Sequence, residues 1–471
     1  MKLLKHFPLS VLFVLLACSS FSQIYHPDYV ATIVFDGIDS AGPTESGVFG
    51  VDEPNELVDI MCDILETESG FTNPTRPDQV ALASYYGDTY PSYYSQSDKN
   101  DVQNVTNVYG GGMPRYAMIM AKFCVRVMER SGAKQVNVAG VSMGSLVARW
   151  MIENDYEGLA SSGKIARFVT IEGALCGNWA CSQSDSITDL LEDDYDLETI
   201  DIQHMNYTWV EDNLHNPRTE MGESVYGNMI IVQWASTDPD MYSEALTIAS
   251  GEPNDGICLY EDAYFHTYQP GTLYMNMPPT LSHAFATHQT IKEHMGIRAG
   301  LAAGMKSTKR VKITLVSAEV TDLPEPSFFD EGEVVFGCSV ISPQANVRFG
   351  ITEPVNRIDH LGRTIEPVEM DVDESVTVNK VLFNDFILPG ETVLNLVFNV
   401  QEIDFDYVYD IVENPFDENQ EIESGSIQVP VTTNGQYSHS TDEWGGQIKV
   451  EVYEYPAFIT PSAQLCSWCF Y

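Results

Sequence analysis

A serine flanked by glycines in the first third of the chain has the surroundings of a nucleophile. It lies in the segment Gly140-Val141-Ser142-Met143-Gly144, between an apolar run (residues 134–139) and a stretch with helical spacing (residues 145–154). A sharp turn between a strand and a helix needs small neighbours and lifts a serine hydroxyl above the sheet edge. The alternative is an ordinary strand–helix turn in which the serine caps the helix. The pattern predicts covalent catalysis through Ser142.

The surroundings of this serine resemble the nucleophile turn of the α/β-hydrolase family, specifically of its bacterial lipases and esterases. Residues 138–149 read VAGVSMGSLVAR, similar to the lipase sequence V-G-H-S-M-G-G-L-V-A-R. Val141 stands where lipases often have His, and Ser145 replaces a second Gly, but neither change removes a catalytic group. The resemblance covers about residues 30–301. It implies an ester hydrolase with Ser142 as the nucleophile.

The same resemblance implies an oxyanion hole. Val34-Phe35-Asp36-Gly37-Ile38 ends the first strong strand, where the family carries His-Gly followed by a backbone donor. By resemblance, the backbone N–H groups of Ile38 and Met143 are the two donors, each contributing on the order of 3 kcal/mol to the stabilisation of the oxyanion. Asp36 replaces the family's His, and a carboxylate beside the hole is unfavourable unless it points away. A plain Asp-Gly turn is the alternative interpretation.

The catalytic acid should follow the serine and precede the histidine. Pro253-Asn254-Asp255-Gly256-Ile257 resembles the family's G-D-G-V-V, and it follows the apolar run at residues 228–235. Asp255 is therefore the predicted acid. Asp238 and Asp240 lie nearer the end of the run and are rivals, and a turn aspartate before glycine is the alternative role for Asp255.

Two histidines are candidates for the general base. His288 is followed by Ile291, Ile297 and Leu301 at helical spacing, as the family's base precedes the last helix. His283 lies closer to the predicted strand at residues 272–277, but the spacing after it is poorer. We expect His288 to take the Ser142 proton, with His283 as the rival.

The elements that must position these residues alternate in type. Strand patterns at residues 30–35, 79–85, 134–139, 167–172 and 228–235 are interleaved with helical spacing at residues 54–66, after Pro114 and at residues 145–154. Such alternation predicts an α/β-hydrolase sheet with helices on both faces. The catalytic domain should span residues 23–305. Residues 175–222 form a long insertion that mixes acidic and apolar residues, and either a lid over the acyl pocket or a solvated loop would fit.

From about residue 306 alternating strands replace helical spacing, at residues 311–320, 333–341, 375–383, 392–400 and 447–455. This predicts an all-β antiparallel sandwich domain over residues 306–471. Its Asp residues resemble those of the calcium- and lipid-binding sandwich modules of signalling proteins, and oxygen ligands from two loops suit Ca²⁺. The candidate ligands are Asp322, Asp330, Asp404, Asp406 and Asp410. A solvated acidic loop is the alternative, and ester hydrolysis by the proposed serine requires no cofactor.

The N-terminus reads as an export signal over residues 1–22, with Lys2 and Lys5 before a short apolar stretch. The rival is a lipoprotein signal that would lipidate Cys18. We expect an extracellular or periplasmic protein, or an outer-surface lipoprotein, without a transmembrane segment. Export permits disulfides. Two close pairs are candidates, Cys176 with Cys181 at the root of the insertion and Cys466 with Cys469 near the C-terminus.

The net charge of the chain argues against partners that are themselves anionic. The 471 residues include 24 Lys and Arg against 68 Asp and Glu, a net charge of −44, yet 44% of them are hydrophobic. So acidic a chain repels nucleic acid and anionic lipid, while its apolar content predicts folded cores. A small-molecule or lipid ester that is neutral, such as an acylglycerol, fits best. A noncatalytic binding or adhesion protein of the same fold, and an amidase or peptidase on the same triad, are the alternatives.

Overall fold

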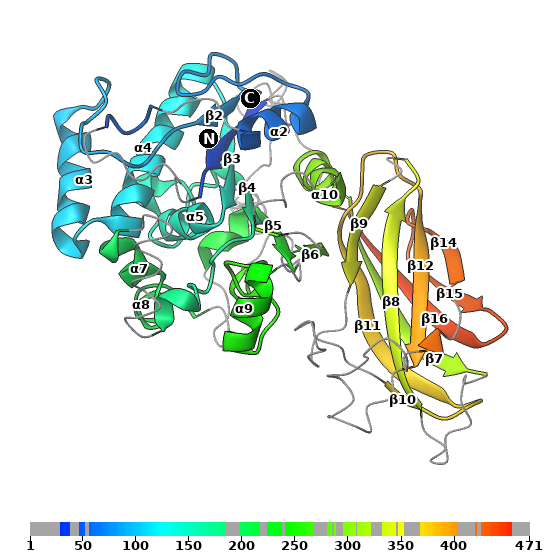
Figure 1. Ribbon diagram of the computed structural model, residues 1–471. Coiled ribbons are helices and arrows are strands. Elements are labelled where there is room, and N and C mark those ends of the chain that lie inside the picture. The colour runs from blue at the N-terminus through cyan, green and yellow to red at the C-terminus, as the bar shows by residue number, and fades with distance from the viewer. Residues whose placement is uncertain are drawn as a thin grey trace, which may run out of the picture.

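A computed structural model (Figure 1) describes most of the chain as one helix-covered parallel sheet and two antiparallel sheets, which confirms the predicted fold class. The described residues are 29–37, 47–51, 56–183, 198–216, 224–237, 241–266, 280–284, 287–288, 295–307, 309–321, 332–344, 347–352, 368–402, 420–421 and 425–454. Outside them lie the predicted signal with Cys18, the strand expected at residues 272–277, the pair Cys466 and Cys469, and all five candidate calcium ligands. The export signal and the calcium site therefore stay predictions.

The parallel sheet carries the apolar runs found in the sequence. Its strands are β1 (Val30–Phe35), β2 (Val80–Leu82), β3 (Gln135–Val141), β4 (Ile165–Ile171), β5 (Ile230–Ser236) and β6 (Thr280–Ala284). They lie in the order β2-β1-β3-β4-β5-β6, and every neighbouring pair is parallel. Strands buried on both faces read as near-continuous apolar runs, and here single polar residues such as Asn137, Arg167 and Gln233 interrupt them. Because all strands run the same way, the residues that follow them meet at one edge of the sheet.

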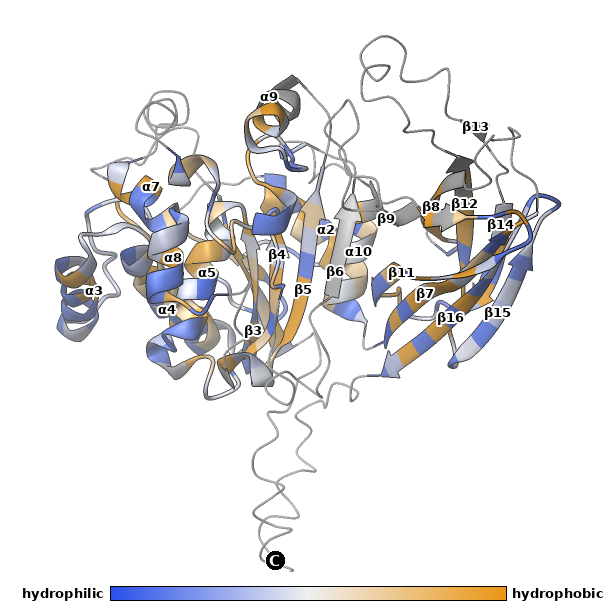
Figure 2. Cartoon of the chain, turned by 90° about the horizontal axis from the view of Figure 1, so that it is seen from below, coloured by the Kyte–Doolittle hydropathy of each residue, from blue (hydrophilic) through white to orange (hydrophobic). Residues whose placement is uncertain are grey.

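Helices cover both faces of this sheet (Figure 2). They are α2 (Glu56–Leu65), α3 (Gln96–Tyr109), α4 (Gly112–Ser131), α5 (Met143–Glu153), α7 (Thr199–Met205), α8 (Tyr207–Asn213), α9 (Met241–Ser250) and α10 (Met295–Lys306). Helices α2 and α10 bury their apolar residues with Val34, Val232 and Trp234 on one face, while α4 and α5 pack against Ile33 and Val138 on the other. Successive strand residues thus supply opposite cores, as the pleat requires.

The C-terminal strands form two antiparallel sheets. They are β7 (Lys309–Val320), β8 (Gly332–Ser342), β9 (Val347–Thr352), β10 (Val368–Met370), β11 (Ser375–Phe386), β12 (Val393–Glu402), β13 (Gln420–Glu421), β14 (Gly425–Pro430), β15 (Gly435–Ser440) and β16 (Trp444–Glu454). One sheet contains the path β10-β8-β12-β13, and the other has the order β11-β7-β16-β15. Trp444 joins them, because its ring packs against Phe336 at 5.8 Å and Phe398 at 5.0 Å between centroids.

The change from helices to strands falls where the sequence predicted it. Helix α10 ends at Lys306 and β7 begins at Lys309. Helix α10 contacts β9 and β11, and the core shared by α2 and α10 continues into the antiparallel sheets. The division into domains at residues 305 and 306 stays a prediction. Among the described residues, no helix combines the length and the apolar character needed to cross a bilayer.

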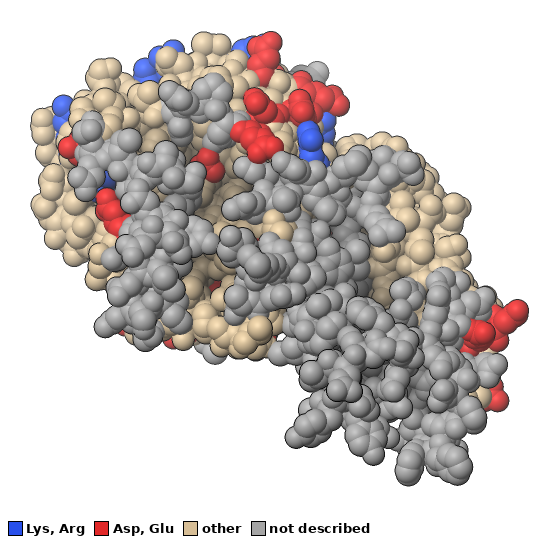
Figure 3. Space-filling view, viewed as in Figure 1, with Lys and Arg blue, Asp and Glu red and all other residues tan. Residues whose placement is uncertain are grey.

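Acidic side chains are exposed on the outside of α2 and in the turn after it. Glu56, Asp59, Asp63, Glu66 and Glu68 line this surface, and Figure 3 shows acidic side chains gathered on this part of the molecule, with a few basic ones among them. Arg298 on α10 pairs with Asp63 at 3.1 Å, and Lys306 pairs with Glu66 at 3.3 Å. Exposed pairs of this kind contribute little stability, so these acids are solvated exterior.

Candidate active site

Ser142 lies at a strained turn between β3 and α5. Its backbone has φ 51° and ψ −129°, with a positive φ that non-glycine residues rarely adopt. The Ser142 N–H donates to the carbonyl oxygen of Ile171 at 3.0 Å, which fixes the turn to the end of β4. Met143 begins α5, so its N–H belongs to the first helical turn and has no carbonyl partner within the helix. This is the geometry of a nucleophile turn.

The glycines of the motif are required by close packing rather than by their backbone angles. A Cβ on Gly140 would lie 2.6 Å from the Cα of Ser145. A Cβ on Gly144 would collide with the carbonyl oxygens of Phe35 and Asp36 at the end of β1. The turn can therefore close onto β1 only with glycine at both positions. The neighbouring loop is also near, since a Cβ on Gly37 would lie 3.7 Å from the Ser142 Oγ.

The loop after β1 brings Asp36 and Gly37 beside the serine. Asp36 Oδ1 accepts a hydrogen bond from the Gly37 N–H at 2.8 Å, and the Tyr85 hydroxyl donates to the carbonyl oxygens of Asp36 at 2.7 Å and Gly37 at 3.0 Å. The Asp36 carboxylate thus contacts a backbone donor, which compensates part of its charge. Ile38, the predicted oxyanion donor that follows, lies outside the described residues.

Asp255 and His288 are in direct contact. The Asp255 Oδ2 lies 2.7 Å from the His288 Nδ1, and the His288 backbone N–H donates to the Asp255 carbonyl oxygen at 2.9 Å. The other carboxylate oxygen accepts from the N–H groups of Ile257 at 2.9 Å and Cys258 at 2.6 Å. Burial raises the pKa of Asp255, but the charge of His288 and these hydrogen bonds outweigh it, so the pKa is lower than usual. Asp255 is therefore held as a buried carboxylate.

The two candidate bases, His283 and His288, lie in different parts of the structure. His283 lies within β6, where its backbone is in register with Ala235 of β5. His288 follows the end of that strand and reaches Asp255, with 12% of its side chain exposed. The strand before His288 is Thr280–Ala284, later in the chain than the predicted residues 272–277. Asp238 and Asp240 lie outside the described residues.

A second buried acid, Glu172, joins this pair and was not predicted as a site residue. It follows β4, its Oε2 lies 3.9 Å from the His288 Nδ1, and its Oε1 accepts a hydrogen bond from the Ser236 hydroxyl. The signal available in the sequence was position alone: an acid directly after a buried strand falls on the edge where the other site residues meet. The Cys258 Sγ, a carboxylate oxygen of Asp255 and a ring nitrogen of His288 also lie within 4.8 Å of one another.

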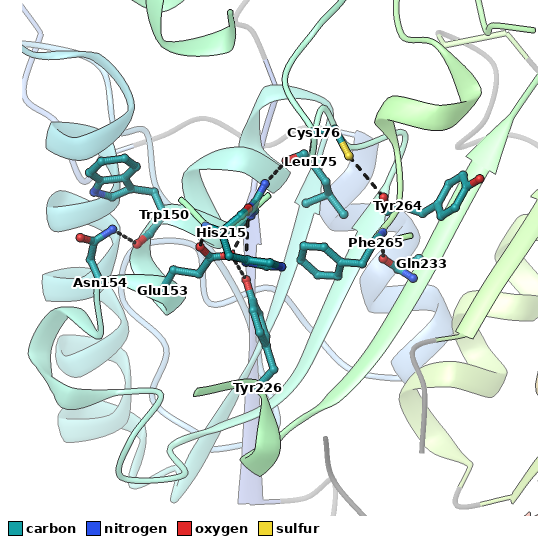
Figure 4. A network of polar contacts seen from close by, with 11 residues as sticks. Trp150, Glu153, Asn154, Leu175, Cys176, His215, Tyr226, Gln233, Tyr264 and Phe265 are labelled. Atoms are coloured by element: carbon teal, nitrogen blue, oxygen red, sulfur yellow. Dashed lines mark hydrogen bonds and ion pairs between the residues drawn. The ribbon is translucent and has the colours of Figure 1, made fainter. Parts of the chain in front are cut away.

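The insertion after β4 is anchored to α5, the helix that begins directly after Ser142 and is called the nucleophile helix below. Arg149 of α5 is fully buried and donates to the carbonyl oxygens of Leu175 and His215, which lie on the two described sides of the insertion. Glu153, one turn later, accepts from Arg149 Nε at 2.8 Å and from the Tyr226 hydroxyl at 2.8 Å (Figure 4). Within residues 198–216 the insertion forms α7 and α8, so this part is ordered helix rather than a solvated loop.

The candidate disulfide between Cys176 and Cys181 at the root of the insertion is not formed. Cys176 and Cys181 are both buried and are not joined to each other. Cys176 Sγ donates to the carbonyl oxygen of Tyr264 at 3.4 Å. Burial raises the pKa of Cys181 to about 12, so it remains a protonated thiol. The physical reason is position: Cys176 contacts the Tyr264 carbonyl oxygen, whereas Cys181 is packed in the apolar core that α4 and α5 share.

Comparison with known proteins finds likeness in structure but not in sequence. No protein family and no curated protein matches the chain by sequence. Among solved structures, the mature lipase BlEst2 of Bacillus licheniformis is similar, with a TM-score of 0.31 and 9% identity over 52% of this chain and 82% of that chain. Phospholipase PlaB of Legionella pneumophila is similar, with a TM-score of 0.38 and 9% identity over 80% of this chain and 87% of that chain.

A third solved structure is also similar over part of the chain. A C2-DSL-EGF1 structure from Drosophila aligns with a TM-score of 0.18 and 10% identity over 31% of this chain and 67% of that chain. The fold itself follows from the strand order, the strained serine turn at the end of β3 and the acid and histidine at the same sheet edge. The chain has the α/β-hydrolase fold, followed by antiparallel sheets.

Proposed function

We propose that the protein is an exported serine carboxylester hydrolase, of the lipase or esterase kind, that acts on neutral esters such as acylglycerols. The observation that carries the proposal is the contact of 2.7 Å between Asp255 and His288 at the same sheet edge as the strained Ser142 turn. An acid–imidazole pair at the same sheet edge as a serine presented in this way is the set of groups that acyl transfer needs.

In the proposed reaction, His288 donates its Nδ1–H to Asp255, which leaves Nε2 to take the proton of Ser142. The serine oxygen attacks the ester carbonyl, and the backbone N–H groups of Met143 and Ile38 stabilise the oxyanion. His288 then protonates the leaving alcohol. Water, activated by the same imidazole, releases the acid and restores the serine. The proposed chemistry uses side chains and backbone groups of this chain throughout.

The negative net charge of the protein favours a neutral substrate over an anionic one. With 68 acidic against 24 basic residues, the protein as a whole repels anionic substrates. A neutral ester meets no such repulsion. The predicted signal over residues 1–22, with lipidation of Cys18 as the alternative, would bring the enzyme to the extracellular or periplasmic side.

Hydrolysis of p-nitrophenyl esters by the wild type and by Ser142→Ala tests the proposal, with Ser145→Ala as a matched buried control. We expect loss of turnover and of fluorophosphonate labelling only in Ser142→Ala. Equal labelling of Ser142→Ala and wild type would contradict the proposed nucleophile. Absence of labelling in the wild type would favour a noncatalytic binding protein, and turnover of amides but not esters would favour an amidase or peptidase.

A further inference from the structure

Glu172, the residue that follows β4, has a strained backbone and is almost completely buried at the catalytic edge of the sheet. Its backbone has φ 51°, a positive value at a residue with a Cβ, and its N–H donates to the carbonyl oxygen of Trp234 at 3.0 Å. Only 1% of the residue is exposed. Strained conformations of this kind persist where the surrounding contacts enforce them, and they concentrate at functional sites.

Three side chains at the catalytic edge converge on the Glu172 carboxyl group. Ser236, at the end of β5, donates to Oε1. Asp255 is hydrogen-bonded to Glu172 through their carboxyl groups. His288 presents Nδ1 at 3.9 Å from Oε2 and at 2.7 Å from Asp255 Oδ2. The imidazole therefore faces two buried carboxyl groups, one in contact with Nδ1 and one slightly more distant.

A hydrogen bond between two carboxyl groups requires a proton on one of them, because two buried carboxylates in contact would repel each other strongly. Burial first, and then the charge of Asp255, raise the pKa of Glu172 well above its ordinary value of 4.5. Asp255 has the opposite tendency, since contact with His288 and donors on its other oxygen stabilise its charge. Among the described residues, the titratable groups facing Glu172 are Asp255, His288 and Cys258.

We propose that Glu172 is a second acid of the site, which carries the proton shared with Asp255, orients the Asp255 carboxylate toward His288, and replaces Asp255 as the counter-charge when that charge is removed. This rests on the proposed hydrolase function. Glu172 acts through Asp255 in the intact protein and is therefore a positioning residue. Because Glu172 is protonated, the only negative charge of the pair that faces the imidazole of His288 is that of Asp255.

The ability of Glu172 to replace Asp255 as the counter-charge, here called the reserve role, follows from the same contacts. In Asp255→Asn the charge that disfavours ionisation of Glu172 is gone, and the new amide can donate a hydrogen bond to a Glu172 carboxylate. Glu172 would then ionise and stabilise the imidazolium of His288 from its present distance of 3.9 Å or closer. In Asp255→Asn/Glu172→Gln neither carboxylate remains, although both side chains keep nearly the same shape.

The experiment compares wild type, Asp255→Asn, Glu172→Gln and the double variant, using kcat for a p-nitrophenyl ester at neutral pH. We expect Glu172→Gln to lower kcat by a smaller factor than Asp255→Asn does, because its amide can still donate to Asp255 but the proton behind the carboxylate is lost. Asp255→Asn should lose about 10- to 100-fold, and the double variant about 10⁴-fold, the usual consequence of losing a triad acid. Equal kcat for Asp255→Asn and the double variant would overturn the reserve role.

A readout that does not depend on turnover tests the shared proton. The infrared difference spectrum of wild type minus Glu172→Gln at neutral pH should contain the carbonyl stretch of one protonated, buried carboxylic acid, because the contributions of other buried acids with a raised pKa, such as Asp201, are common to both proteins and cancel. Glu211→Gln, which changes an exposed acid on α8, is the control and should leave the band unchanged. Absence of the band from this difference spectrum would overturn the proposal whether or not the protein hydrolyses esters.

Discussion

Gly144 packs so closely against the end of strand β1 that any side chain there would collide with the carbonyl oxygen of Asp36. This contact fixes the distance between the nucleophile turn and the loop that should supply an oxyanion donor. The second glycine of the Gly-x-Ser-x-Gly motif therefore has a positional role. It allows the start of α5 and the end of β1 to meet side by side.

Gly144→Ala should consequently impair both stability and catalysis. The added methyl group forces the turn away from β1, which should cost about 1–3 kcal/mol of unfolding free energy and lower kcat by about 100-fold if the serine moves by about 1 Å. Urea unfolding and ester hydrolysis would measure the two effects. Gly445→Ala is the control, since a Cβ there makes only an ordinary contact of 3.4 Å with the carbonyl oxygen of His439. Similar behaviour of both variants would contradict the packing argument.

The choice between the two histidines gives a second prediction. His288→Gln should lose about 10³-fold or more in kcat, because the imidazole that takes the Ser142 proton and protonates the leaving alcohol is removed. His283→Gln should keep kcat within a few-fold, since residue 283 lies within β6 and pairs with β5. Initial rates with a p-nitrophenyl ester, with the fold checked by circular dichroism, separate the two. A larger loss in His283→Gln would reverse the assignment.

The sequence predicted those parts of the fold in which local pattern and burial agree. Strand β1 has the predicted bounds, and β3, β4, β5 and the core-facing helices differ by a few residues. Helix α3 was missed because it is largely polar, with Val102 as its buried residue. Its sequence signal was the capping box of Ser95 and Asp98, where each side chain accepts from the other's backbone N–H.

The site was predictable where a motif frames the residue. Ser142 and Asp255 stand in recognisable turns, whereas Glu172 has no motif around it. Its role depends on strand order, because β4 and β5 must be neighbours before Glu172, Ser236 and His288 can meet. Sequence separation hides such a cluster. The same limit applies to the choice of histidine, which depends on where β6 ends.

A third prediction concerns pH and the insertion. Asp201 of α7 is buried and accepts a hydrogen bond from the Tyr116 hydroxyl of α4 at 3.3 Å. Burial, and then the charge of Glu198, raise the pKa of Asp201 to about 7. Since the folded pKa exceeds the unfolded one, this group's contribution to stability is present below about pH 4 and is lost as the pH rises toward 7.

Asp201→Asn should therefore raise the melting temperature at pH 8 much more than at pH 4.5. The corresponding gain in the free energy of unfolding at pH 8 is at most about 4 kcal/mol, which is the free energy of a pKa rise from 3.8 to about 7. Differential scanning fluorimetry at both values would measure it. Asp212→Asn, an exposed position on α8 in the same insertion, is the control and should show no such difference. A gain that is equal at both pH values would contradict a titrating Asp201.

The anchoring of the insertion gives the last prediction. Arg149→Met should destabilise the protein by about 3–5 kcal/mol, because it leaves the buried Glu153 charge and the carbonyl oxygens of Leu175 and His215 without their donor. Arg76→Met is the control: its side chain is 48% exposed and pairs with Asp78 at 3.1 Å, so its loss should cost under about 1 kcal/mol. Urea unfolding compares the two. Equal losses would show that Arg149 does not hold the root of the insertion, whereas a loss confined to Arg149→Met ties the insertion to the nucleophile helix α5.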